Sequence, residues 1–267
     1  VYYTAYAMSE TAHFSLLMVV LMLLMSAGRD RKTGFAAGAV TAFFFLIRAT
    51  AVFLVPLEML YLAWRRRWKQ LLLVLAGFAL VVSPWVIRNT MVMGSPILLP
   101  TKGSLNLWMR NHPEVLALEG IEIPSDIPIN SPELLEYPAM DSIPGELARC
   151  DLVGSAATSF MADNPRLVLW LAWNRAGRFL SPGGDTLGQR ARMFGYVFYG
   201  IMLVGITGLW RNRRTPEAVL LAAVFVFYLL LHSMAHGGVR YRLPVDAVFL
   251  IGAVLCGRCG RGESCAG

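Results

Sequence analysis

The chain has 267 residues, of which 56% are hydrophobic and 15% are charged, and its mean hydropathy is +0.54. Soluble domains are about 45–50% apolar and about 25% charged, so this composition excludes an ordinary soluble domain and predicts an integral membrane protein. The formal net charge of +7 does not indicate nucleic-acid binding, because the basic residues cluster at the ends of apolar runs, as in membrane proteins.

Two apolar runs near the start of the chain predict membrane helices, which need about 20 residues to cross. Residues 3–27 predict one spanning helix that ends at the basic sequence GRDRK, which we place in the cytoplasm. Residues 35–64 are apolar apart from Arg48 and Glu58 and end at RRRWK. Because basic clusters flank both ends of this run, it predicts two short helices, out and back, with Arg48 near the outer turn. Glu58 is expected to snorkel towards the cytoplasmic cluster or to pair with it.

The sequence changes character after a further predicted crossing at residues 70–86. Residues 88–165 contain nine of the 14 prolines and no apolar run of spanning length, so they predict an extracytoplasmic loop that is partly folded. Residues 167–180 predict a helix that lies in the outer interface, with its tryptophans at headgroup depth. The alternative, a spanning helix, would place the basic residues 211–214 outside.

Three apolar runs complete the predicted bundle, at residues 194–210, 218–231 and 245–256. We therefore predict an all-α integral membrane protein, a multi-pass helical bundle with a partly folded extracytoplasmic loop. Its predicted parts are N-terminal transmembrane helices (1–87), an extracytoplasmic loop (88–192) with an interfacial helix near 167–180, C-terminal transmembrane helices (193–257) and a cytoplasmic tail (258–267).

The four cysteines predict no disulfide framework. Cys150 lies in the predicted loop, and the other three crowd the C-terminus in the sequence CGRCGRGESC. One C-x-x-C pair without a second pair of ligands is a weak zinc signal, so we expect reduced cytoplasmic thiols there.

The short hairpin HGGVRYRLPVD, residues 236–246, lies between two apolar runs and faces outward in this topology. Arg240 and Arg242 in an outer loop run against the charge bias that orients membrane proteins. Snorkelling to lipid headgroups explains them without a function. A bound anion, such as a phosphate held by a guanidinium fork, explains them by a function, and both explanations stay open.

Four stretches of the chain share the order of motifs of a known family: AGAVTAFFFLIRAT (37–50), SPWVIRNTMVMG (83–94), KGSLNLWMRNHPE (102–114) and VRYRLPVD (239–246). They resemble the bacterial glycosyltransferase family 39, part of the GT-C superfamily with protein mannosyltransferases and the aminoarabinose transferase that modifies lipid A. The resemblance implies an inverting enzyme of the bacterial inner membrane. Such an enzyme transfers a sugar from a polyprenyl-phosphate donor to an acceptor at the extracytoplasmic face, and the acceptor is not specified.

The chain departs from the family pattern in two places. Arg110 stands where the family usually has the glycine that precedes the asparagine matching Asn111. The family's catalytic acid lies in the first extracytoplasmic loop, upstream of the region that matches. We therefore expect the general base to be missing and the chain to be inactive alone.

Glu10 is the candidate catalytic residue within the chain, as an acid that positions the donor rather than as the base. An ionisable group in a spanning segment is a functional candidate by default, and the alternative is an acid favoured by the helix dipole. His13 lies one turn away, but two ligands are too few to assign a metal site. A divalent metal stays open as a cofactor.

The remaining candidate residues fall into two groups. We expect the donor phosphate to be bound by arginines at one depth and by an adjacent tyrosine: Arg48, Arg88, Arg240, Tyr241 and Arg242. Polar and aromatic groups of the outer loop are candidates for contact with sugar or acceptor, with ordinary loop structure as the alternative: Lys102, Asn106, Trp108 and Asn111.

Two other functions share these features. A transporter or flippase for a lipid-linked anion would also place arginines in the membrane, although transporters often show internal repeats, and we find none between the halves. A non-catalytic membrane remnant is the third possibility. The expected partners are a polyprenyl-phosphate sugar and membrane lipids, and no nucleic acid.

Overall fold

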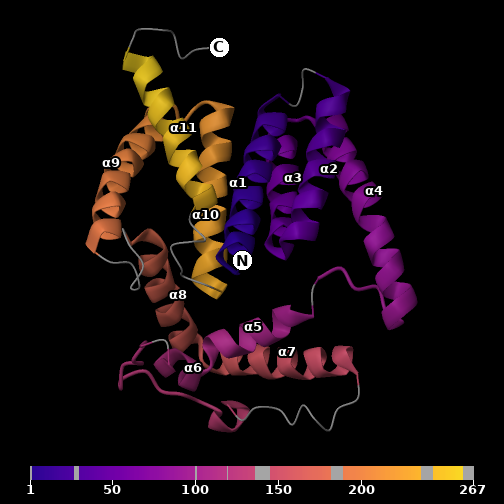
Figure 1. Ribbon diagram of the computed structural model, residues 1–267, viewed down its shortest axis with the longest axis vertical. Coiled ribbons are helices and arrows are strands. Elements are labelled where there is room, and N and C mark those ends of the chain that lie inside the picture. The colour runs from indigo at the N-terminus through magenta and orange to yellow at the C-terminus, as the bar shows by residue number, and fades with distance from the viewer. Residues whose placement is uncertain are drawn as a thin grey trace. The chain divides into compact units, whose positions relative to one another are not determined.

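The computed structural model describes residues 2–26, 30–99, 101–118, 120–135, 145–181, 189–235 and 243–260. The described residues form helices and connecting segments and contain no β-strand (Figure 1). In chain order the elements are α1 (Tyr2–Ser26), α2 (Arg31–Ile47), the 3-10 helix η1 (Ala49–Phe53), α3 (Leu54–Trp64), α4 (Trp68–Met93), α5 (Lys102–Asn111), α6 (Pro113–Leu118), the 3-10 helix η2 (Pro132–Leu135), α7 (Glu146–Asp163), α8 (Pro165–Leu180), α9 (Gln189–Arg211), α10 (Pro216–Ala235) and α11 (Leu243–Gly260). The prediction of an all-helical chain is confirmed for this part of the protein.

The chain divides into two compact units. The first, here called the bundle unit, comprises Val1–Leu98, Thr186–Tyr228 and Arg242–Gly267. The second, here called the loop unit, comprises Leu99–Asp185 and Leu229–Tyr241.

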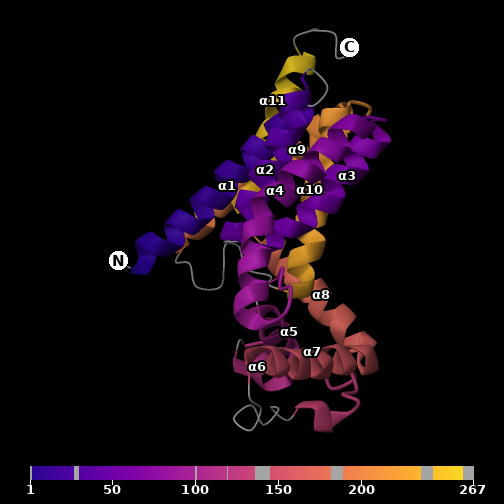
Figure 2. The ribbon, with the colours of Figure 1, turned by 90° about the vertical axis from the view of Figure 1, so that its right-hand side faces the viewer.

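Helices α2 and α4 pack backbone against backbone in the bundle unit, and they lie side by side in both Figure 1 and Figure 2. A Cβ atom at Gly38 would collide with the carbonyl oxygen of Val74, and one at Gly34 would collide with the side chain of Gln70. Small residues permit this approach, as is usual between membrane helices. The contacting positions advance together along both helices, so the helices are parallel.

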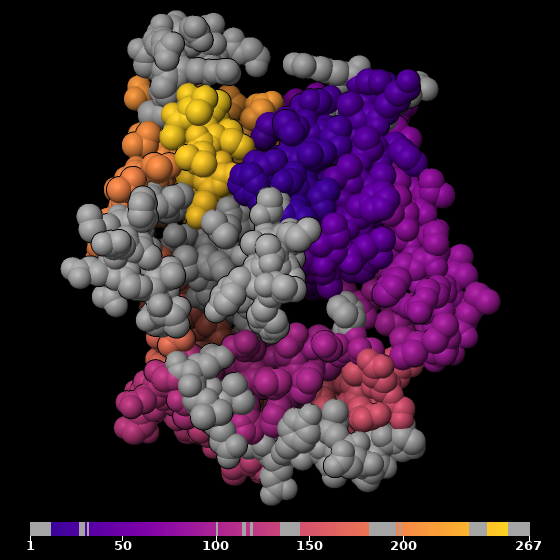
Figure 3. Space-filling model, in the orientation of Figure 1, coloured from indigo at the N-terminus to yellow at the C-terminus, as the bar shows by residue number. Residues whose placement is uncertain are grey.

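A second close pair joins α9 and α11. A Cβ atom at Gly205 would collide with the carbonyl oxygen of Phe249, and one at Gly252 would meet the carbonyl oxygen of Gly205 and the side chain of Leu209. The contacting positions advance together along both helices, so this pair is also parallel. On the face shown in Figure 3, side chains of α11 (yellow) lie against those of α1 (indigo).

The predicted pair of short helices at residues 35–64 is confirmed. Helix α2 ends at Ile47, and Arg48 has an extended backbone with φ −145° and ψ 108° before η1 and α3 begin. Helix α3 returns beside α2, as is seen from the hydrogen bond of 2.6 Å that the Thr41 hydroxyl of α2 donates to Glu58 Oε1 of α3.

The prediction for Glu58 is wrong. Its carboxyl neither snorkels nor pairs with the cytoplasmic cluster but is 1% exposed, where α1, α3 and α10 meet around Leu21 and Leu220. The side of α3 that carries Glu58 faces the neighbouring helices, so the carboxyl finds the Thr41 hydroxyl instead of solvent. Its second oxygen, Oε2, has no hydrogen-bond partner among the described residues.

Three basic segments meet at one end of the bundle unit. The Gln70 side-chain amide donates to the carbonyl oxygen of Asp30 at 3.1 Å, which joins the starts of α2 and α4. Tyr61, near the end of α3, lies within electrostatic range of Arg67 and of Glu217 at the start of α10. This end, here called the basic end, carries Lys32, Arg65, Arg66, Arg67, Lys69, Arg211, Arg213 and Arg214. The basic clusters therefore lie together, as the out-and-back topology requires.

Helices α4 and α10 are long and apolar enough to cross a membrane. Only 28% of the most apolar window of α4 and 39% of that of α10 is buried, whereas the core helix of a soluble protein is mostly buried. Large apolar side chains such as Leu72, Leu80 and Leu230 are accordingly exposed. Apolar surface on this scale suits contact with lipid, and it supports association with a membrane.

Helix α4 continues past its predicted end. Pro84 lies inside the helix without ending it, and the helix stops at Gly94, whose backbone is left-handed (φ 72°) and whose N–H donates to the carbonyl oxygen of Thr90 at 2.9 Å. A glycine in this conformation is a common helix terminator. Arg88 therefore lies within α4, which corrects the expectation that it follows the helix.

The loop unit has a helical core of its own. Trp108 of α5 packs against Val153 and Ala157 of α7. A second group of buried side chains brings α6, α7 and α8 together: Leu116, Ile121, Phe160, Leu167 and Leu171. The predicted helix at residues 167–180 is α8, and the region before it holds more regular helix than the proline content indicates.

Candidate functional site

Two buried polar side chains of the bundle unit, His13 and Tyr228, form a hydrogen-bonded pair; together with the partly exposed Arg48 we call them the His13 cluster. His13 Nε2 and the Tyr228 hydroxyl share a hydrogen bond of 2.9 Å, and the two residues are 2% and 1% exposed. The guanidinium of Arg48 lies within electrostatic range of that hydroxyl. A buried polar pair with a nearby cation is costly among apolar helices, and such groups mark functional positions.

Each member of the His13 cluster comes from a different segment. His13 lies on α1, Tyr228 lies on α10, and Arg48 occupies the break after α2. The ring of Phe44 meets that of His13 edge to face, with centroids 4.5 Å apart. Sequence reasoning considered His13 only as a partner of Glu10 and missed Tyr228, because the two members of the pair are 215 positions apart.

Arg88 is exposed on α4, and its guanidinium lies 5.8 Å from the ring centroid of Trp85. It donates a hydrogen bond of 3.2 Å to Asn89 Oδ1, and the Asn89 amide donates to the carbonyl oxygen of Ile97. Of the described candidates for phosphate binding, Arg48 thus follows α2 and Arg88 lies on α4.

Several predicted site residues lie outside the described residues. Arg240, Tyr241 and Arg242 fall between α10 and α11, in residues that the structure does not describe. Glu10 lies on α1, but its side chain is also outside the described part. Their proposed roles stay predictions.

The loop unit contains a cavity of about 350 Å³ between α5 and α7, here called the Glu146 cavity. Its lining residues are Thr101, Lys102, Leu105, Glu146, Arg149, Cys150 and Val153. The Thr101 hydroxyl donates to Glu146 Oε1 at 2.5 Å, and the Cys150 thiol donates to the Thr101 carbonyl oxygen at 3.2 Å. Of the predicted loop residues, Lys102 lies in this cavity and Asn106 is exposed on α5.

The side chains of the Glu146 cavity can bind a polar ligand, but they do not include a reactive nucleophile. Its carboxylate accepts hydrogen bonds, while Lys102 and Arg149 donate them to hydroxyl or anionic groups. Burial raises the pKa of the Cys150 thiol, and the nearby charges of Glu146 and Asp151 add to the effect. The thiol therefore stays protonated at neutral pH and is a poor nucleophile.

Asn111 and Arg175 form a buried network in the loop unit. Asn111 is 2% exposed, and its amide donates to the Leu107 carbonyl oxygen at 2.7 Å. Arg175 of α8 donates to Asn111 Oδ1, to the carbonyl oxygen of Arg110 and to that of Met234. Asn111 thus lies in the interior of the unit and Trp108 in its apolar core, whereas sequence analysis placed both in the substrate loop.

No group of three or more histidine, cysteine, aspartate or glutamate side chains that could hold a metal ion lies within the searched, described residues. The described donors near the His13 cluster and in the Glu146 cavity suit hydroxyl and anionic ligands instead.

Replacing Tyr228 by phenylalanine is expected to lower the free energy of unfolding by about 1 kcal/mol, because a buried hydrogen bond to His13 is lost. Thermal unfolding in detergent measures the change. Tyr196→Phe is the matched control, because Tyr196 is 64% exposed. Equal losses in both variants would contradict a stabilising His13–Tyr228 bond.

Comparison with known proteins gives no relative for this chain: no family model, no curated protein and no solved structure matches it.

Proposed function

We propose that the protein is a multi-pass membrane glycosyltransferase of the GT-C type, in the bacterial inner membrane. Its proposed role is to hold the polyprenyl-phosphate donor for inverting transfer of the sugar to an acceptor at the extracytoplasmic face. The proposal starts from the four short stretches that resemble glycosyltransferase family 39. The residues of the bundle unit support it in two further ways.

The arrangement of charge supports the orientation. Cytoplasmic segments of membrane proteins are enriched in lysine and arginine, and tryptophans mark the membrane boundary. The basic end of the bundle unit has both features, because Trp64, Trp68 and Trp210 are exposed next to its basic residues. We therefore assign the basic end to the cytoplasm.

The position of Arg48 carries the proposal. Helix α2 begins at the basic end and has 17 residues, so Arg48 lies about 25 Å away along the helix, close to the thickness of the hydrocarbon layer. The proposal therefore puts its guanidinium at the outer boundary, within electrostatic range of the Tyr228 hydroxyl. A polyprenyl phosphate places its phosphate at the same boundary.

The chemistry requires a cation at that position. When the sugar leaves the donor, the bond between the anomeric carbon and the phosphate oxygen breaks, and negative charge develops on the departing phosphate. A guanidinium can pair with two phosphate oxygens and stabilise that charge. Arg48 serves this role in the proposal, and Arg88 of α4 is the second candidate.

The Glu146 cavity is proposed to bind a hydroxyl-rich ligand, either the acceptor or its sugar. Glu146 accepts hydrogen bonds from hydroxyl groups, and Lys102 and Arg149 donate them. Lys102 lines this cavity, and it also belongs to the stretch 102–114 that resembles the family's outer loop.

Replacing Arg48 by glutamine is expected to weaken the binding of a polyprenyl monophosphate about tenfold, because one charge-assisted phosphate contact is lost. The monophosphate is the product common to all donors of this class, so the test does not depend on the sugar or on turnover. Binding is measured in nanodiscs of zwitterionic lipid by microscale thermophoresis.

Arg166→Gln is the control for that measurement, because Arg166 is an exposed arginine of the loop unit. Arg48→Lys should restore part of the affinity, since it restores the charge but not the fork geometry. Equal affinities for the wild type, Arg48→Gln and Arg166→Gln would overturn the donor-phosphate role.

A flippase for a lipid-linked anion would use the same arginine, and a second experiment separates the two functions. Vesicles that contain the protein and a polyprenyl-phosphate sugar are assayed both for free polyprenyl phosphate and for the leaflet in which the lipid lies. Release of polyprenyl phosphate, or donor that is bound but stays in its leaflet, supports the transferase. Exchange between leaflets with the sugar–phosphate bond intact would favour transport.

A further inference from the structure

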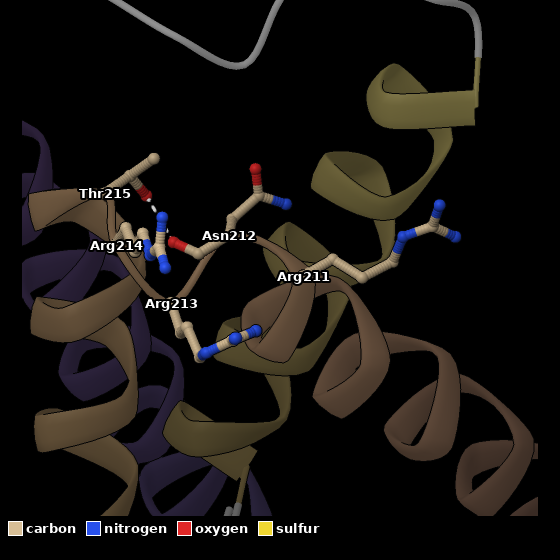
Figure 4. Close-up of a pocket in the computed structure, with 5 residues that line it drawn as sticks. All are labelled: Arg211, Asn212, Arg213, Arg214 and Thr215. Carbon is tan, nitrogen blue, oxygen red and sulfur yellow. Dashed lines mark hydrogen bonds between the residues drawn. The ribbon is translucent and has the colours of Figure 1, made fainter.

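The turn between α9 and α10 forms a cavity of about 400 Å³ at the basic end, and Figure 4 shows its lining residues, which run from Arg211 to Thr215. The backbone of the turn is fixed by hydrogen bonds. The Asn212 amide donates to the Gly208 carbonyl oxygen at 2.8 Å, and the Thr215 hydroxyl donates to the Asn212 carbonyl oxygen at 2.9 Å. The turn therefore holds its arginines on a defined scaffold.

The arginines of this turn carry charge that the described residues do not neutralise. Arg213 lies 5.0 Å from the ring centroid of Trp210 and donates to the Trp210 carbonyl oxygen at 3.2 Å. Arg211 and Arg214 form no ion pair with any described residue. Glu217, the acid that follows in α10, lies within electrostatic range of Tyr61.

The directions of the side chains favour a surface over a single enclosed anion. In Figure 4 the guanidinium group of Arg211 lies well apart from those of Arg213 and Arg214. One small phosphate ion cannot contact guanidinium groups that lie apart, whereas neighbouring headgroups of a lipid layer can meet each of them.

The residues around the turn are of the types that membrane proteins place at the depth of the lipid headgroups. Exposed tryptophans adjoin two of the three basic segments at this end, with Trp64 55% exposed, Trp68 61% and Trp210 67%. Tryptophan prefers headgroup depth, and nearby lysine and arginine residues attract the anionic lipids of the cytoplasmic leaflet. The described acids at this end are Asp30 and Glu217, against the larger set of cations that defines it.

We propose that the α9–α10 turn binds the phosphate groups of anionic phospholipids, with Arg211 and Arg214 as the principal contacts. The guanidinium groups pair with phosphodiester oxygens, and Trp210 holds Arg213 at the same depth. The site lies at the end of the bundle unit opposite Arg48 and does not depend on glycosyl transfer.

The test compares lipid binding of the wild type with that of the double variant Arg211→Gln/Arg214→Gln. Purified protein in detergent is titrated with phosphatidylglycerol or phosphatidylcholine, and native mass spectrometry counts the retained lipids. We expect the double variant to bind phosphatidylglycerol about tenfold more weakly and phosphatidylcholine equally well. The double variant Arg166→Gln/Arg178→Gln, on α8, removes the same charge from the loop unit and should retain wild-type binding.

Two further measurements distinguish binding of a lipid phosphate from binding of free phosphate and from a general effect of charge. Inorganic phosphate at millimolar concentration should not displace phosphatidylglycerol, and efficient displacement would overturn the assignment to lipid. Equal losses in both double variants would show a general charge effect and would also overturn it. If Arg211→Gln/Arg214→Gln does not fold, Arg214→Gln alone is used, and unchanged phosphatidylglycerol binding in that variant would contradict the proposal.

Discussion

Replacing Gly38 by alanine is expected to lower the free energy of unfolding by about 3 kcal/mol, the upper part of the usual range for overpacking. The added Cβ atom would collide with the backbone carbonyl of Val74, which cannot rotate away as a side chain could. Helices α2 and α4 must therefore separate. Thermal unfolding in detergent, followed by circular dichroism, measures the loss.

Gly200→Ala is the matched control for this prediction. Gly200 also lies within a helix of the bundle unit, but nothing lies within 4 Å of a Cβ atom placed there. Alanine should stabilise that position by up to about 1 kcal/mol, because it favours helix more than glycine does. A destabilisation at Gly200 as large as at Gly38 would contradict backbone contact as the cause.

Replacing Arg175 by methionine is expected to cost about 3 kcal/mol of unfolding free energy. Arg175 is 5% exposed, and it donates to three acceptors in other segments. Methionine retains the length of the side chain but leaves Asn111 Oδ1 and two carbonyl oxygens without this buried donor, and such a loss is expensive. Thermal unfolding in detergent measures the change.

Two variants sharpen the Arg175 prediction. Arg166→Met, on the same helix but exposed, should change the stability little. Arg175→Lys should recover only part of the loss, because an ammonium lacks the planar fork that reaches several acceptors. Full recovery with lysine would show that charge, rather than hydrogen-bond geometry, stabilises the network.

The helices of the bundle unit could be predicted because their signals are local. Apolar runs give their positions, and the basic clusters at alternate ends give the order of the crossings. The break at Arg48 followed from the same reasoning, since one long helix would have separated two basic segments. The end of α4 was misjudged because the fall in hydropathy after Val86 was taken as its boundary, although Gly94 is the structural stop.

The polar contacts could not be predicted, because each joins segments that are distant in the chain. Arg175 follows the pattern of an interfacial arginine in sequence, and only folding brings it to Asn111, 64 positions away. The same holds for Glu58, whose surroundings come from α1, α3 and α10. Charged residues in apolar helices thus indicate important positions without indicating their partners.

The parallel glycine-packed pairs have a consequence for biosynthesis. Two parallel helices that pack side by side are not consecutive in this chain, because a short connection joins antiparallel helices and a returning helix must lie between them. Helix α2 can receive α4 only after α3 has been made, and α9 can receive α11 only after α10 has been made. Until then the glycine surface of the earlier helix lacks the partner that covers it. Each pair therefore assembles after a delay, and a ribosome that stalls within α10 would leave α9 as a half-assembled intermediate for proteases to recognise.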